Sequence, residues 1–154
     1  MTTRTNATRR TAREWAIQML TAAELNPPED LQAFMSDYFD QISDLEPGDG
    51  GASNAHGKLK RFAEERFIGV KTEEAEIDAI LQKQLADWDI YRLGTVERVV
   101  MRMGIWELKN KREEIPPGVV INEALDLANW FSTPKSRTLI NGVLDGYAKA
   151  TENK

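Results

Sequence analysis

Apolar residues recur every three to four positions along most of this chain, which is the spacing of one face of an α-helix. Proline, glycine and polar residues separate these stripes. No segment alternates apolar and polar residues as a half-buried strand does, and the β-branched run at 119–121 is too short to indicate one. The pattern therefore predicts an all-α fold of about seven helices. The stripes lie at residues 12–23, 31–42, 59–70, 77–85, 96–108, 121–131 and 139–147.

Several helix ends carry recognisable signals. Thr11 followed by Glu14 fits a capping box, in which a hydroxyl and a carboxylate each accept a hydrogen bond from a backbone N–H. The first helix is therefore expected to start at this point. Thr72 is expected to cap the fourth helix. Pro116-Pro117 and the Ser-Thr-Pro sequence at 132–134 separate the last three helices.

Two segments are expected to lie outside the helices. Residues 1–10 are expected to form a basic, flexible arm, with Arg9 and Arg10 either preceding the first helix or lying in its frayed first turn. Residues 46–57 form a mobile loop, because their glycines and small polar side chains bury too little surface to offset the entropy of ordering. We expect the whole chain, residues 1–154, to be a single helical domain made of two small bundles that share a core.

Length and composition narrow the class of protein. A chain of 154 residues with 41% hydrophobic residues is long enough to bury a globular core. It contains no cysteine, which removes disulfides and thiolate chemistry and fits the cytoplasm. No run of about eighteen apolar residues indicates a membrane span, and the basic start lacks the apolar region of a secretory signal. These features favour a cytoplasmic protein without a membrane partner.

Positive charge is concentrated at the start of the chain. The first thirteen residues contain Arg4, Arg9, Arg10 and Arg13 and no acidic residue, so the net charge of −5 leaves −9 on the remainder. A basic segment on an acidic body is typical of a protein that binds a polyanion. Exposed charges are screened beyond about 10 Å at ~0.1 M salt, so these arginines would act in direct contact with phosphates. A solubilising terminus is the alternative reading.

Residues suited to catalysis are few. The one histidine, His56, lies in the glycine-rich loop, where nothing in the sequence fixes its geometry. The carboxylates of Glu73, Glu76, Glu123 and Asp126 have the spacing of solvated helix faces. We therefore expect a binding protein and not an enzyme, with no cofactor and no metal.

A second basic cluster, Lys135 and Arg137, flanks Ser136 at the start of the last predicted helix. Cations oppose the dipole at a helix N-terminus, whereas phosphate oxygens are favoured there. The cluster is either a second phosphate contact or ordinary surface charge. Trp130 lies off the apolar stripe of the preceding helix, and an exposed indole at that position suits a protein contact.

Four blocks in a fixed order carry a family pattern. They are the arginine-rich start at 9–20, a looser block at 96–108, the segment 116–128 centred on Ile121-Asn122-Glu123-Ala124, and Leu139-Ile140-Asn141-Gly142-Val143-Leu144-Asp145. Together they resemble the NusB family of bacterial transcription antitermination factors. The match covers nearly all of the chain outside residues 26–57.

The resemblance implies two three-helix bundles and a role in transcription. Members of the family bind the boxA element of nascent RNA, a single-stranded target, jointly with the ribosomal protein NusE. They then join the RNA polymerase antitermination complex, and some members form homodimers. The match places Arg9, Arg10 and Arg13 in the RNA-binding motif, with Gln18 on the same helix, and Glu97 near the NusE contact.

These considerations yield one set of expected contacts and two alternatives. A protein-only scaffold would bind its partner through Trp130 or Glu97 without touching RNA. An RNA methyltransferase with a NusB-like domain would need a further cofactor-binding domain. The expected RNA contacts are Arg4, Arg9, Arg10, Arg13, Gln18, Lys135 and Arg137, and the expected protein contacts are Glu97 and Trp130.

Overall fold

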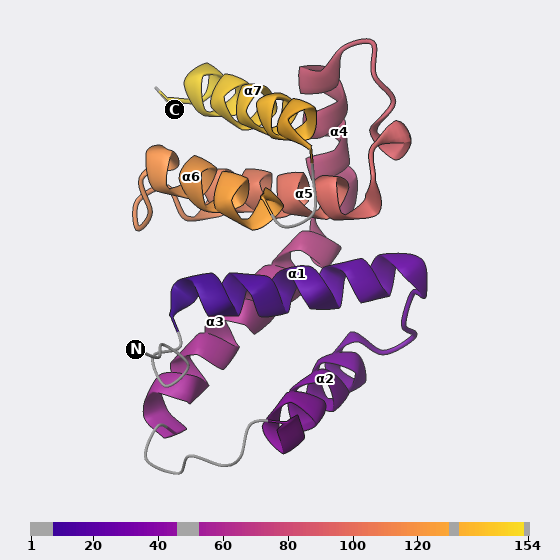
Figure 1. Cartoon of the computed structure of the whole chain (residues 1–154), viewed down its shortest axis with the longest axis vertical. Helices are drawn as coiled ribbons and strands as arrows, with labels where there is room; N and C mark the ends of the chain where they lie inside the picture. The colour runs from indigo at the N-terminus through magenta and orange to yellow at the C-terminus, as the bar shows by residue number, and fades with distance from the viewer. Residues whose placement is uncertain (1–7, 46–52, 130–132, 153–154) are drawn as a thin grey trace. The chain divides into compact units, whose positions relative to one another are not determined.

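The computed structural model describes residues 8–45, 53–129 and 133–152. Within these ranges the chain forms seven α-helices, one short 3-10 helix and no strand, so the all-α prediction is confirmed. No helix among the described residues is long and apolar enough to cross a membrane. The elements are α1 (Arg9–Leu25), α2 (Leu31–Leu45), α3 (Ser53–Thr72), α4 (Glu74–Leu85), η2 (Ile90–Arg92), α5 (Thr95–Asn110), α6 (Pro117–Ala128) and α7 (Pro134–Ala150) (Figure 1).

The chain divides into two compact units, Met1–Ile68 and Gly69–Lys154. The first unit is built from α1, α2 and most of α3, and aromatic side chains join these three helices. The rings of Trp15 and Phe39 meet edge to face with 5.7 Å between centroids, and Phe34 stacks on Phe67 at 5.5 Å. The other buried apolar residues of this unit are Ala12, Ala16, Ile17, Met19, Leu20, Ala23, Met35 and Ala63.

Helix α5 is the centre of the second unit. It packs against α4, α6 and α7, and every residue from Arg98 to Leu108 is buried. The sequence predicted a single apolar stripe here, whereas this part of α5 is buried around its whole circumference. Consequently three charged side chains of α5, those of Arg98, Arg102 and Glu107, lie in the interior.

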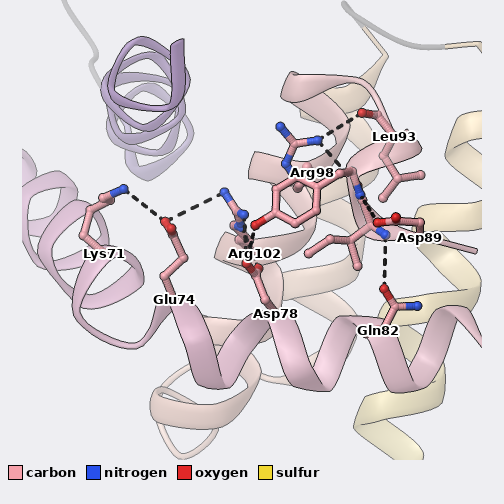
Figure 2. Close-up of polar contacts among 10 residues, drawn as sticks. Lys71, Glu74, Asp78, Gln82, Asp89, Leu93, Arg98 and Arg102 are labelled. Atoms are coloured by element: carbon pink, nitrogen blue, oxygen red, sulfur yellow. Dashed lines mark hydrogen bonds and ion pairs between the residues drawn. The ribbon is translucent and has the colours of Figure 1, made fainter. Parts of the chain in front are cut away.

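A polar network connects α4, α5 and the turn between them (Figure 2). Arg102 donates to both carboxylate oxygens of Asp78, at 2.8 and 2.9 Å, and Glu74 lies 3.8 Å from the same guanidinium. Arg98 donates to the carbonyl oxygen of Leu93 at 3.1 Å. Burying an unsatisfied cation is costly, so these contacts are what allow α5 to carry arginines in its buried segment.

The pair of Glu73 and Lys109 predicts a small dependence of stability on pH. Burial raises the pKa of Glu73, but hydrogen bonds from Lys109 and Asn110 outweigh it and hold that pKa below its usual 4.5. Such a group stabilises the fold above its unfolded pKa and loses this contribution as pH falls through the folded pKa. We expect Lys109→Met to lower the free energy of unfolding at neutral pH by less than about 1 kcal/mol, because the pair is partly exposed. Well below pH 4.5 the substitution should change stability little, as denaturant titrations at both pH values would show.

The start of α1 differs from the prediction. Thr8, not Thr11, is the N-cap residue. Its backbone is extended and its hydroxyl accepts a hydrogen bond from a backbone N–H of the first turn, so the helix starts three residues earlier than predicted. The N–H of Thr11 donates to the Thr8 hydroxyl at 3.4 Å, and the N–H of Thr8 donates to the Thr11 hydroxyl at 3.5 Å. Arg9 and Arg10 therefore lie in the first helical turn, one of the two placements expected for them, and α1 begins within the predicted arm of residues 1–10. Residues 1–7 of that arm lie outside the described residues.

The ends of α3 also correct two predictions. The helix takes up residues 53–57 of the predicted loop, and the His56 ring lies 5.5 Å from that of Trp15, a contact within the first unit. Residues 46–52 of that loop lie outside the described part of the chain. Thr72 is the last residue of α3 and does not cap α4. Glu73, the one residue between the two helices, occupies the N-cap position of α4.

Candidate nucleic-acid interface

The first turn of α1 presents positive charge to solvent. Arg9 and Arg10 are exposed, and the turn contains no acidic residue. Cations at a helix N-terminus cost about 0.3–1 kcal/mol each, because the helix dipole is positive there. Backbone N–H groups at the same end, together with two guanidinium groups, make this turn a site that favours a bound anion.

Three arginines surround the ring of Phe62 on α3. The guanidinium carbon of Arg66 lies 3.4 Å from the ring centroid, and those of Arg9 and Arg13 lie at 5.2 and 5.3 Å. Arg13 and Arg66 are only 3% and 1% exposed. Of the helical arginines predicted to touch RNA, Arg9 and Arg10 thus offer their side chains to solvent, whereas Arg13 lies inside the first unit.

Gln18 is held on the exposed surface of α1. Its side-chain oxygen accepts a hydrogen bond from the Tyr38 hydroxyl of α2. Burial raises the pKa of Tyr38 above its usual range and the charge of Glu14 adds to this, so the hydroxyl stays protonated as a donor. Burial also raises the pKa of Glu14, against the opposing effect of Arg10. The amide NH₂ of Gln18 is then the group that would donate to an RNA acceptor.

The second basic cluster lies at the start of α7, in the second unit. The Thr133 hydroxyl accepts a hydrogen bond from the N–H of Ser136 at 3.1 Å and caps the helix. Lys135 is exposed and Arg137 is half-buried. The prediction that these two residues open the last helix is confirmed. Their role as RNA contacts stays a prediction.

Glu97 is fixed by contacts within the second unit. It lies in the first turn of α5, where a carboxylate suits the helix dipole, and one of its oxygens accepts a hydrogen bond from the Ser136 hydroxyl at 3.2 Å. Its other oxygen lies against Gly94, where a Cβ atom would come within 2.2 Å. Glu97 is therefore a preorganised carboxylate. Trp130 and Arg4, predicted to contact a protein and RNA respectively, lie outside the described residues.

Two of the carboxylates considered for catalysis, Glu73 and Glu76, form ion pairs on the helix surface. Glu73 and Glu76 lie 2.9 and 3.4 Å from the Lys109 ammonium. Among the residues that the structure describes, no group of three or more acidic or histidine side chains is placed to hold a metal ion.

Comparison with known proteins covers nearly the whole chain. The family model described as "NusB family" matches residues 10–149. The chain belongs to the NusB family. The transcription antitermination protein NusB of Nitratiruptor sp. is 35% identical to it over 147 residues, which cover 96% of this chain and 96% of the relative.

Solved NusB structures share the fold. NusB of T. maritima matches with a TM-score of 0.77 at 29% sequence identity, over 93% of this chain and 92% of that one. A chain from the crystal structure of the antitermination factors NusB and NusE in complex with dsRNA matches with a TM-score of 0.73 at 25% identity, over 92% of this chain and 96% of that one. Both likenesses extend over both units of the chain.

Sequence reasoning missed two residues of this candidate site, Phe62 and Arg66 on α3. Phe62 lies within the apolar stripe predicted at residues 59–70, and Arg66 lies one turn later on the same helix face. Their i, i+4 spacing beside an arginine-rich helix was the available signal. The predicted RNA contacts themselves form two described groups, Arg9, Arg10, Arg13 and Gln18 on α1, and Lys135 and Arg137 on α7.

Proposed function

We propose that this protein is a transcription antitermination factor that binds boxA-type RNA jointly with the ribosomal protein NusE. The observation that carries the proposal is the exposed pair of Arg9 and Arg10 on the acid-free first turn of α1. The name of the Nitratiruptor relative and the NusB–NusE–dsRNA structure support it. The role is one of binding without catalysis, in the cytoplasm, where it would engage the RNA polymerase antitermination complex.

The chemistry of arginine fits this role. A guanidinium donates two parallel hydrogen bonds to a phosphate and stacks on unpaired bases, which makes it suited to single-stranded RNA. In the proposed complex Arg9 and Arg10 contact the RNA directly, and Arg13 stiffens the turn behind them. Gln18 contributes an amide donor on the same helix, and Lys135 and Arg137 are further candidate phosphate contacts.

The NusE contact is proposed for the second unit. Glu97 offers a carboxylate already oriented by Ser136 and Gly94, so binding a cationic group of a partner requires little rearrangement. Trp130 remains the second proposed contact. A homodimer of the free protein is a separate prediction, tested by its sedimentation behaviour.

Replacing both Arg9 and Arg10 with alanine should weaken RNA binding and flatten its salt dependence. Each phosphate contact with a single strand contributes about −0.7 to the slope of log affinity against log salt, so the double variant should lose about 1.4 of that slope. The matched control is Lys83→Ala/Lys149→Ala, which removes two exposed charges from α4 and α7. Unchanged RNA binding by the arginine variant, with the fold intact by circular dichroism, would refute the assignment of these residues.

The joint role with NusE is tested by fluorescence anisotropy of a labelled boxA-type RNA. The RNA is titrated with this protein alone and then in the presence of NusE, single-stranded and as a duplex, with a scrambled sequence alongside. We expect NusE to increase the affinity for the boxA-type RNA, and we expect the scrambled RNA to bind more weakly. Equal affinity for both sequences, or NusE binding that no RNA influences, would favour the protein-only scaffold.

A further inference from the structure

We propose that Phe62 is a positioning residue for RNA binding, whose ring orders the Arg9 side chain before RNA arrives. The inference rests on the function proposed above and deepens it, because it assigns part of the affinity to a residue that need not touch the RNA. The observation behind it is the group of three guanidiniums around one ring, at 3.4, 5.2 and 5.3 Å.

The geometry comes from two facing pairs one helical turn apart. Arg9 and Arg13 lie four residues apart on α1, and Phe62 and Arg66 lie four residues apart on α3, so each pair shares a helix face. The two helices cross within the first unit (Figure 1). The crossing places the ring of Phe62 among the guanidiniums of both helices.

The ring is itself held in place. Arg66 is almost fully buried against it, and its Nη1 donates to the carbonyl oxygen of Phe62 and to the carboxylate of Glu65, at 3.3 Å in each case. An arginine locked by three contacts fixes the ring it covers. Phe62 is therefore a rigid surface against which Arg9, at the exposed end of the cluster, can rest.

Ordering Arg9 in advance strengthens binding. A long side chain loses rotamer freedom when it binds, and a contact that has already restricted it lowers that cost. A cation within about 6 Å of an aromatic ring is attracted to the face of its π-system. The ring accepts no N–H hydrogen bond of ordinary strength, so the donors of Arg9 remain available to phosphate oxygens.

The test is a double-mutant cycle between Phe62 and Arg9, read by anisotropy of a labelled single-stranded boxA-type RNA. Phe62→Leu keeps an apolar side chain but removes the ring, and should weaken binding about two- to fivefold. In the Arg9→Ala background the same substitution should have no measurable effect, because the residue it positions is gone. Phe62→Trp retains an aromatic face and should bind as tightly as the parent.

Salt dependence and a matched control separate positioning from general damage. Arg9→Ala should reduce the slope of log affinity against log salt by about 0.7, whereas Phe62→Leu removes no charge and should leave the slope unchanged. Phe34→Leu alters another half-buried ring of the first unit, one that stacks on Phe67, and should not affect RNA binding.

Each outcome decides a different point. An equal loss from Phe62→Leu in both backgrounds, or no loss at all, would overturn the positioning role while leaving the proposed function standing. An Arg9→Ala variant that binds RNA like the parent would overturn the positioning role and the assignment of Arg9 together. A parent chain that binds no RNA, alone or with NusE, would remove the proposed function itself.

Discussion

Replacing Gly69 with alanine is expected to lower the free energy of unfolding of the second unit by about 3 kcal/mol. A Cβ atom at this position would lie 2.3 Å from Nε1 of Trp106 and 2.4 Å from its Cε2, well inside van der Waals contact. The indole is rigid and buried on α5, so it can move aside only by displacing the core around it. In a helix free of such contacts the same change would stabilise by about 1 kcal/mol.

The matched control is Gly142→Ala in α7. Nothing lies within 4 Å of a Cβ atom built there, so this substitution should raise stability by up to about 1 kcal/mol. Both variants are compared with the parent by denaturant unfolding followed by far-UV circular dichroism. Shifts of opposite sign are expected, and a Gly69→Ala protein as stable as the parent would show that the indole does not press against this backbone.

The helices were predictable because their cause is local. Each apolar stripe repeats at helical spacing. The prolines before α6 and at the start of α7 mark helix boundaries whatever the tertiary packing is. Exact starts were harder to predict. Thr8 and Thr11 both have the side chain of a capping residue, and they share the cap of α1 between them, so the sequence alone could not rank them.

The candidate site was predictable only in part, because its details depend on how helices pack. The four arginines near the start of the sequence indicate a polyanionic partner. Composition does not distinguish Arg9, which is exposed, from Arg13, which is buried. That difference arises from which side of α1 meets α3. For the same reason the sequence shows Phe62 only as one position of the apolar stripe at 59–70, although its ring is the surface on which three guanidiniums meet.

The buried charges of α5 illustrate the same limit. Arg98 and Arg102 look like ordinary surface residues in the sequence, since charged side chains are seldom fully buried. Their burial becomes possible only when α4 and the turn before α5 supply acceptors, among them Asp78 and the carbonyl oxygen of Leu93. No periodic pattern encodes such pairings. Asp78 precedes Arg102 by 24 residues, and Leu93 precedes Arg98 by five.

The substitution Asp78→Ala is expected to cost the most stability, about 3–5 kcal/mol. Arg102 is 2% exposed and donates to both oxygens of Asp78. Because a guanidinium cannot lose its proton in a protein, removing the carboxylate leaves a cation in the interior with Glu74 3.8 Å away. Thermal and denaturant unfolding should both report the loss. It should persist at high salt, since buried pairs are screened far less than exposed ones.

Two comparisons show whether burial of charge is the cause. Asp145→Ala breaks the pair with Lys149 on α7, whose side chains are 45% and 73% exposed, and should cost less than about 0.5 kcal/mol. Asp78→Leu/Arg102→Met removes both charges and should recover most of the stability, because an apolar pair of similar volume replaces a buried ion pair at little cost. If this double variant is as unstable as Asp78→Ala, the geometry of the pair, and not the burial of a cation that has lost this carboxylate, is what holds α4 against α5.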